Sequence, residues 1–244
     1  MTSHQVSSSG PRRAAALAAA AALLLGLGAC GGGGGNGIAD EAPEDALAQA
    51  VEAAREAGTV LLRGGSSGGG ERLELDLRLS AEAGATGSIT VDGGTAQVRF
   101  DGDERAFLQG DEAFWQASGA PEDLVGALAG QFVEAPQFAD ALRELTDFDA
   151  FVDGIAEPEG DLRAGEVAEV SEADGAELYE LVTDQGSLFL ATEGEPYPVL
   201  LRDDDGDLLL SDWGAEVAVE LPEDAPTVDD LVREQDAAGA DEGA

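Results

Sequence analysis

The 244-residue sequence contains no lysine, a single histidine (His4) and a single cysteine (Cys30). Without lysine the chain cannot form Schiff bases, and with one cysteine it cannot form an internal disulfide. Zinc sites built from histidine and cysteine need more of these residues than the chain has. Stability must therefore come from packing, for which 43% hydrophobic residues are sufficient.

Positive charge is also scarce. All 12 basic residues are arginines, and they face 51 Asp and Glu residues, which gives a formal net charge of −39. A chain without a basic patch cannot displace counterions from phosphate groups, which excludes ordinary nucleic-acid binding. The same charge argues against an electrostatic attachment to anionic lipid.

The N-terminal residues 1–29 have the three parts of an export signal peptide. Pro11-Arg12-Arg13 ends a positive region, and residues 14–27 form an apolar stretch shorter than the ~20 residues of a membrane span. Leu27-Gly28-Ala29-Cys30 matches the lipobox of bacterial lipoproteins, in which the cysteine sulfur is acylated before the signal is cut. This pattern predicts an anchor to the extracytoplasmic face of the cell membrane through Cys30. An ordinary signal cut after Ala29 is the alternative, and the export route, Sec or twin-arginine, stays open.

Cleavage before Cys30 also restricts the chemistry of the chain. It leaves 10 arginines against all 51 acidic residues, a net charge of −41, and it removes the only histidine. Catalytic systems of the Ser-His-Asp or Cys-His type are then excluded. Paired carboxylates remain, but no segment combines a buried acid with the aromatic platform of a sugar-cleaving site. We therefore expect no enzyme activity, no cofactor and no metal.

One acidic run needs a separate interpretation. Asp203-Asp204-Asp205-Gly206-Asp207 suggests calcium, because hard cations prefer clustered oxygen ligands. An EF-hand loop requires a glutamate near its twelfth position, where this chain has Gly214. We therefore interpret the run as a hairpin turn.

The residues after the signal predict one domain between two irregular segments. Residues 30–41 are expected to be the lipidated cysteine and a glycine-rich tether, 42–234 the domain, and 235–244 a disordered acidic tail. A helix is expected over residues 42–57, since Pro43 suits its first turn and Gly58 its end. The Gly- and Ser-rich residues 64–70 are interpreted as a loop without the ending of a phosphate-binding loop.

Strand patterns then alternate with a helical region. Leu73, Leu75, Leu77 and Leu79 alternate with polar residues, as in a half-buried strand. Further strands are expected around residues 89–91, 96–100, 107–108, 166–171, 176–183, 187–192, 197–202, 207–212 and 216–221. Helices are expected from Pro121 to Leu128, around 138–145, after a capping box of Thr146 and Asp149, and after Thr227 and Asp230. Strands, helices and strands again indicate an α+β fold with helices on one face of an antiparallel sheet.

Several segments of the sequence, taken in the order in which they occur, resemble the LppX/LprAFG lipoproteins of actinobacteria, which share the LolA/LolB-like fold. The resemblance covers roughly residues 42–230, and its segments are the Cys30 anchor, 87–91, 107–110, 114–115, 130–133, 186–192, 196–199, 210–214 and the segment at Pro222. It implies a strongly curved antiparallel half-barrel whose concave face is covered by helices around an apolar cavity. It also implies a role in binding or carrying a lipid or lipoglycan at the cell envelope. The chain departs from the family in its acidity, its lack of lysine and its 5% aromatic content.

On this basis, eight apolar residues are candidates for the cavity wall: Ile89, Val91, Phe107, Phe114, Trp115, Phe132, Phe138 and Leu142. Ordinary core packing is the alternative for the aromatic members, and Trp213 is expected to fix a turn against the sheet. The arginines on or beside strands (Arg63, Arg72, Arg78, Arg99 and Arg202) would have to gather at the opening if an anionic head group were bound.

Two further expectations concern the protein as a whole. A scaffold or protein-interaction lipoprotein with a closed core and no ligand is the alternative function, and a monomer is the default state. The acidity on solvent-facing strand positions suggests adaptation to saline surroundings.

Overall fold

The computed structural model describes residues 35–67, 72–102 and 105–241. All described residues belong to one compact unit, Gly34–Ala244. The predicted signal peptide, Cys30 and residues 31–34 of the predicted tether lie outside the described residues. Residues 35–41 of the tether are described and pack against the domain, where Ile38 is buried in the core and the Asn36 amide donates a hydrogen bond to the carbonyl of Ala191.

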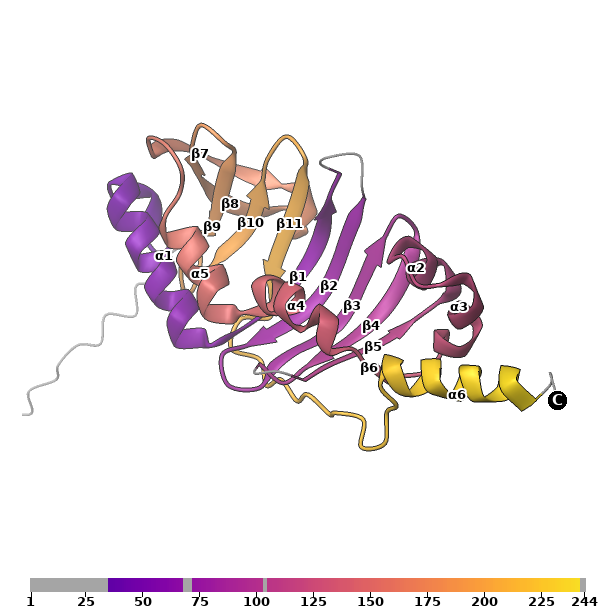
Figure 1. Ribbon diagram of the computed structural model, residues 1–244. Coiled ribbons are helices and arrows are strands. Elements are labelled where there is room, and N and C mark those ends of the chain that lie inside the picture. The colour runs from indigo at the N-terminus through magenta and orange to yellow at the C-terminus, as the bar shows by residue number, and fades with distance from the viewer. Residues whose placement is uncertain (1–34, 68–71, 103–104, 242–244) are drawn as a thin grey trace, which may run out of the picture. The chain divides into compact units, whose positions relative to one another are not determined.

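Eleven strands form one antiparallel sheet that curves strongly around the helices (Figure 1). Their order across the sheet is β6-β5-β4-β3-β2-β1-β11-β10-β9-β8-β7, so the sheet is open between β6 and β7 in the described part of the chain. The strands are β1 (Thr59–Ser66), β2 (Leu73–Ser80), β3 (Gly84–Val91), β4 (Gly94–Phe100), β5 (Ala106–Gly110), β6 (Val133–Glu134), β7 (Arg163–Val170), β8 (Ala176–Val182), β9 (Ser187–Ala191), β10 (Pro198–Arg202) and β11 (Gly206–Ser211). This sheet confirms the predicted α+β half-barrel.

The sheet consists of two meanders that meet at its centre. Strands β1 to β6 are neighbours in chain order, and so are β7 to β11. Only the antiparallel pair of β1 and β11 joins the two meanders, with Leu62 opposite Leu210. The first and the last strand of the chain therefore form the middle of the sheet.

The helices pack on one face of the sheet, which we call the concave face (Figure 1). They are α1 (Pro43–Ala57), α2 (Glu112–Ala117), α3 (Glu122–Leu128), α4 (Ala139–Thr146), α5 (Phe148–Ala156) and α6 (Val228–Asp241), with 3₁₀ turns η1 (Ile38–Asp40) and η3 (Pro136–Phe138). A further 3₁₀ turn, η4 (Ser171–Ala173), connects β7 to β8. Helix α1 begins at Pro43 and ends before Gly58, whose φ of 66° is left-handed, as predicted.

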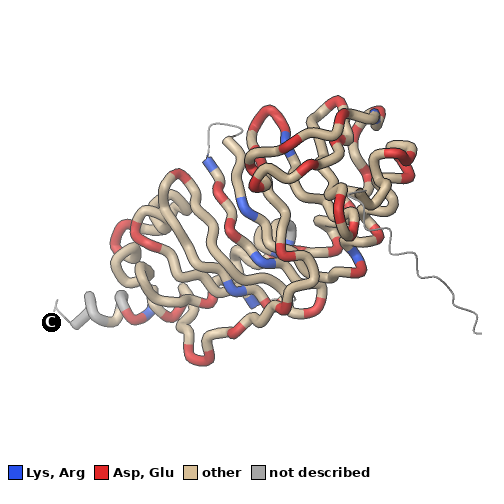
Figure 2. Tube along the Cα trace, turned by 180° about the vertical axis from the view of Figure 1, so that it is seen from behind, with Lys and Arg blue, Asp and Glu red and all other residues tan. Residues whose placement is uncertain are grey.

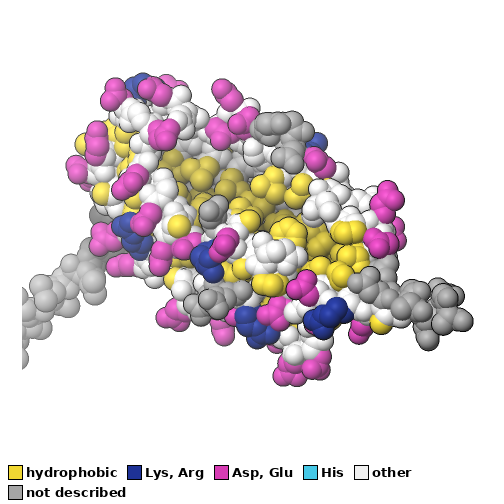
Figure 3. Space-filling view, in the orientation of Figure 1, with side chains coloured by type: hydrophobic (Ala, Val, Ile, Leu, Met, Phe, Trp, Pro, Cys, Tyr) yellow, Lys and Arg dark blue, Asp and Glu magenta, His cyan; other side chains and the backbone are white. Residues whose placement is uncertain are grey.

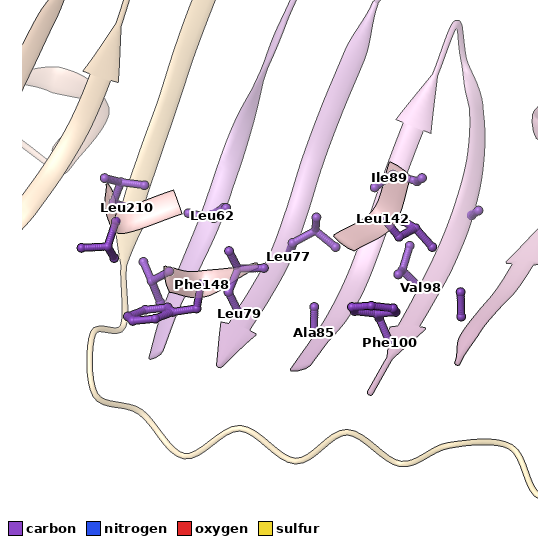
Figure 4. Close-up of a cluster of buried hydrophobic side chains, with 14 of the residues drawn as sticks. Leu62, Leu77, Leu79, Ala85, Ile89, Val98, Phe100, Leu142, Phe148 and Leu210 are labelled. Carbon is purple, nitrogen blue, oxygen red and sulfur yellow. The ribbon is translucent and has the colours of Figure 1, made fainter. Parts of the chain in front are cut away.

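The main core lies between the helices and the concave face. Figure 4 shows its centre, where Leu77 and Leu79 of β2 lie beside Leu62 of β1, Phe148 of α5 lies near Leu79, and Leu142 of α4 lies over β3 and β4. Each of these five side chains is at most 4% exposed. A smaller cluster of Val170, Leu178, Phe189 and Leu200 lies apart from this core, and the strand alternation places it on the opposite, convex face.

Strand β1 was missed by the sequence analysis, and its end replaces part of the expected loop 64–70. Residues 64–66 pair with β2 on one side and with β11 on the other. Both neighbouring backbones approach closely here, because a Cβ on Gly64 would lie 2.1 Å from the carbonyl oxygen of Asp207, and one on Gly65 would lie 2.1 Å from that of Leu73. Glycine is required by this packing and does not mark a loop.

Three other expectations about elements are corrected. Asp147, and not Thr146, caps α5, because its carboxylate accepts a hydrogen bond from the N–H of Ala150. Residues 216–221 alternate in exposure but form no strand, since the sheet positions beside β1 and β11 are already filled. Helix α2 carries Phe114 and Trp115 where no helix was expected.

The C-terminal helix begins as predicted but extends further. Thr227 and Asp230 form the expected reciprocal cap, with the Thr227 hydroxyl 2.7 Å from a carboxylate oxygen of Asp230. The expectation of a disordered tail from Gln235 is wrong for residues 235–241, because α6 continues to Asp241.

Candidate ligand-binding cavity

A cavity of about 660 Å³ opens on the concave face between α1, α5 and the strands near the centre of the sheet. Its volume falls within the roughly 300–1,000 Å³ of typical small-molecule sites. Apolar side chains provide most of the wall: Leu47 of α1, Ile155 of α5, Leu162, Leu73 and Leu75 of β2, Leu188 of β9, Leu201 of β10 and Leu208 of β11.

The floor of the cavity is a row of leucines that crosses the sheet. Cross-strand register places Leu75, Gly64 and Leu208 side by side on β2, β1 and β11. The row continues from Leu208 to Leu201 of β10 and Leu188 of β9. Because β1 contributes a glycine, no side chain stands between Leu75 and Leu208. Residues paired directly across antiparallel strands share one face, so the whole row points to the concave side.

Strand β2 shows how the cavity is left open. Its alternating leucines all belong to the concave face, but the helices cover only the second half of the strand. Leu77 and Leu79 are fully buried, whereas Leu73 and Leu75 are half-buried and line the cavity. The space-filling view shows this apolar floor from outside, in the hollow between the covering elements (Figure 3).

The rim of the cavity is polar and carries more acidic than basic residues. Its polar members are Ser66, Glu157, Glu159, Thr183, Gln185, Ser187, Arg202, Asp203 and Asp207. Glu159 accepts a hydrogen bond from the side-chain amide of Gln185, which links the α5–β7 connection to the β8–β9 turn.

Arg202 and Asp207 form the strongest charged contact near the rim. The guanidinium donates two hydrogen bonds of 2.8 Å to the two carboxylate oxygens of Asp207, and a third contact of 2.8 Å reaches Glu172. The hydrogen bond from Arg202 lowers the pKa of Asp207 below its usual value, against the opposing effect of desolvation. The hydrogen bond to Asp207 likewise raises the pKa of Arg202. Both side chains of this pair are therefore charged, and their opposite charges cancel.

The described residues provide neither a membrane-spanning helix nor a metal cluster. Within residues 35–67, 72–102 and 105–241, no helix has the length and hydrophobicity needed to cross a bilayer. In the same residues no three His, Cys, Asp or Glu side chains gather closely enough to hold a metal ion.

The chain is similar in fold to LprF. The crystal structure of LprF from Mycobacterium bovis superimposes with a TM-score of 0.52 at 12% sequence identity, covering 78% of this chain and 99% of that chain. LprF belongs to the lipoproteins that the sequence resembles, so the resemblance is confirmed at the level of the fold. No protein-family model matches the chain, and no curated protein sequence matches it either.

None of the eight predicted wall residues lines this cavity. Ile89 and Val91 come nearest, because they pair across β2–β3 with Leu75 and Leu73, which do line it. Four others belong to the main core at the β3–β5 side of the sheet: Phe114 and Trp115 of α2, Phe138 of η3 and Leu142 of α4. Trp115 packs edge-on against Phe114 and Phe138, with ring centroids 5.3 and 6.4 Å away.

Phe107 and Phe132 lie away from the concave face altogether. On β5 it is Leu108 that pairs with Val98 in the main core, so alternation turns Phe107 to the convex face. There the guanidinium of Arg105 lies 4.8 Å from the Phe107 ring centroid, and that of Arg99 lies 5.6 Å from the Phe132 ring centroid. The prediction of these two as cavity residues assigned them the wrong face.

The structure confirms two smaller expectations. The acidic run 203–207 is the β10–β11 hairpin turn, in which Asp203 accepts hydrogen bonds from the N–H groups of Asp205 and Gly206. Trp213 fixes the chain after β11, because its indole N–H donates to the carbonyl of Pro198 at 2.8 Å and its ring stacks on Tyr197.

Proposed function

We propose that this protein is an exported lipoprotein, anchored to the cell membrane by acylated Cys30, that holds the acyl part of a lipid or glycolipid in the 660 Å³ cavity. The observation that carries the proposal is the leucine row from Leu75 to Leu188, which gives the cavity an apolar floor across five strands. The fold likeness to LprF supports it, since the family that the sequence resembles binds or carries lipids.

The proposed mechanism is passive binding without a catalytic step. Moving an acyl chain from water onto the leucine floor is favourable by roughly 0.8 kcal/mol for each buried CH₂ group. The polar rim would keep the head group at the mouth, in contact with water. The size of the cavity argues against the alternative of a closed-core scaffold.

Native mass spectrometry tests the binding on a chain that begins at Gly34, which contains the whole described core. We expect an added mass that matches an amphiphile, either co-purified or loaded from a dodecyl-chain lipid. The variant Leu208→Trp should lose this mass, because the larger side chain fills the floor. Leu209→Trp is the matched control, since Leu209 is the next residue on β11 and does not line the cavity. An unloaded wild-type chain under all these conditions would refute the binding role.

The anchor is tested separately in the full-length chain. Intact-mass analysis should show a diacylglyceryl and acyl addition on Cys30, and the Cys30→Ser variant should leave the membrane fraction. A mature chain that starts at residue 30 without added mass would instead support the ordinary signal peptide.

A further inference from the structure

The charges around the mouth of the cavity are strongly one-sided. Among the residues that line it, Glu157, Glu159, Asp203 and Asp207 are acidic, and Arg202 is the one base. Arg202 is held by Asp207 and by Glu172 outside the cavity, so its charge is compensated. Glu157, Glu159 and Asp203 are exposed and leave a net negative rim.

The guanidinium of Arg202 also lies on the opposite face of the sheet from the leucine floor. Its neighbour Leu201 belongs to the cavity floor, so alternation along β10 turns Arg202 to the convex face. Its guanidinium lies 5.5 Å from the ring centroid of Phe189, a member of the convex-face cluster.

The other strand arginines follow the same alternation. Arg78 alternates with the leucines of β2, and Arg63 follows Leu62 of the core, so both lie on the convex face, and Arg72 just before β2 reaches Glu74 of that face. Each of them pairs with an acidic side chain there: Arg63 with Asp76, Arg72 with Glu74, and Arg78 with Asp212. Figure 2 shows this rear side, with the arginines along the middle strands among acidic residues.

The six remaining arginines of the described residues do not line the cavity. Four of them pair with acidic side chains: Arg55 with Asp153, Arg105 with Glu134, Arg143 with Asp140 and Arg233 with Asp230. Arg163, beside the rim residue Thr183, pairs with Asp184 at 3.1 Å. Arg99 lies over the Phe132 ring on the convex side. The condition for an anionic ligand, arginines gathered at the opening, is therefore not met in the described part of the chain.

Resting on the proposed function, we propose that the rim selects amphiphiles whose head group is uncharged or cationic and rejects those with a phosphate or carboxylate head group. An acyl chain on the leucine floor brings its head group to Glu157, Glu159 and Asp203. A negative head group then meets like charges at short range without a compensating cation. The apolar floor sets the affinity for the chain, and the rim sets which head groups are accepted.

Three probes with the same dodecyl chain test the proposal by calorimetric titration below their micelle concentrations. Dodecyl maltoside is neutral, dodecyltrimethylammonium is cationic, and dodecyl phosphate is anionic. At low ionic strength we expect the anionic probe to bind about tenfold or more weakly than the neutral one. The difference should shrink at about 1 M salt, where screening acts within ~3 Å.

Charge variants distinguish the effect of the rim residues on ligand affinity from the effect of the overall charge of the protein. Glu157→Gln combined with Glu159→Gln should bring the affinity for dodecyl phosphate toward that for dodecyl maltoside. Glu112→Gln combined with Glu122→Gln is the matched control, because it removes the same charge from exposed sites on α2 and α3 that do not line the cavity. The control pair should leave the preference unchanged.

The outcomes distinguish the two proposals. Equal affinity for all three probes at low salt overturns the selection of head groups and leaves the lipid-binding role standing. An equal gain in phosphate affinity in both variant pairs overturns the role of the rim. Failure of every probe to bind overturns the proposed function itself.

Discussion

A Cβ atom on Gly64 would lie 2.1 Å from the carbonyl oxygen of Asp207 on the neighbouring strand, closer than any side chain allows. Gly64 also has a φ of 138°, which L residues rarely adopt. The Gly64→Ala substitution should therefore separate β1 from β11 and lower the free energy of unfolding by about 3 kcal/mol. Urea unfolding followed by circular dichroism measures the loss.

Gly126→Ala is the control for this substitution. Gly126 lies in α3, and a Cβ there would meet no atom within 4 Å. Alanine is favoured over glycine in a helix, so this variant should gain up to about 1 kcal/mol. A Gly64→Ala protein as stable as the wild type would contradict the close packing of the central strands.

The Arg202–Asp207 pair predicts an acid-dependent part of the stability. The pKa of Asp207 is lowered in the folded state, chiefly by the hydrogen bond from Arg202, from an ordinary value of 3.8. The unfolded carboxyl therefore takes up its proton first as the pH falls, and the stabilisation present above pH 4 disappears below it. Asp207→Asn should cost about 1 kcal/mol at pH 7, since both side chains are more than a third exposed.

Chemical denaturation at a series of pH values measures this difference. The gap between wild type and Asp207→Asn should close as the pH falls through 4 toward the lowered pKa of Asp207. Asp76→Asn serves as comparison, because the Arg63–Asp76 pair has one hydrogen bond and is more exposed. A gap that stays constant down to pH 2 would argue against an ionised Asp207 as its source.

The buried hydroxyl of Tyr179 leads us to expect that replacing this residue by phenylalanine stabilises the protein. Its hydroxyl is buried within the main core and has no hydrogen-bond partner among the described residues. Burial also raises the pKa of this phenol, in keeping with an environment that disfavours charge. Tyr179→Phe removes an unpaired polar atom, so the free energy of unfolding should rise by about 1 kcal/mol. A loss of similar size would indicate a partner for this hydroxyl.

The acidic surface predicts a dependence of stability on salt. A net charge of −39 opposes the compact state through self-repulsion. Raising the salt from about 0.1 M to about 1 M shortens the screening length from ~10 Å to ~3 Å and should raise the melting temperature by several degrees. Differential scanning calorimetry in sodium chloride measures the shift. A melting temperature that does not respond to salt would remove the support for a saline adaptation.

Much of the fold could be predicted because its local signals are strong. The leucines of β2 alternate without interruption, and α1 has a proline at its start and a glycine at its end. Strand β1 gives no such signal, since three consecutive apolar residues are followed by Arg63 and two glycines. Its place at the centre of the sheet depends on contacts with β2 and β11 that the local sequence does not reveal.

The cavity was harder to predict than the fold. Leu75 and Leu208 are neighbours only through β1, and no local pattern relates one to the other. Three of the aromatic residues chosen as candidates fill the core at the other side of the sheet, where Trp115 packs against Phe114 and Phe138, and Phe107 and Phe132 lie on the convex face. The resemblance to a lipid-binding family indicated that a cavity exists, but its position depends on which half of β2 the helices leave uncovered.

The pairing of β1 with β11 has a consequence for the order of folding. Each meander can form from contacts that are close in the chain, whereas the pair of Leu62 and Leu210 must close a loop of nearly the whole domain. The leucine row crosses this junction, with Leu75 on one side and Leu208 on the other. We therefore expect the proposed ligand site to form only after synthesis of the chain has passed β11, and a chain that ends before β11 to bind no ligand.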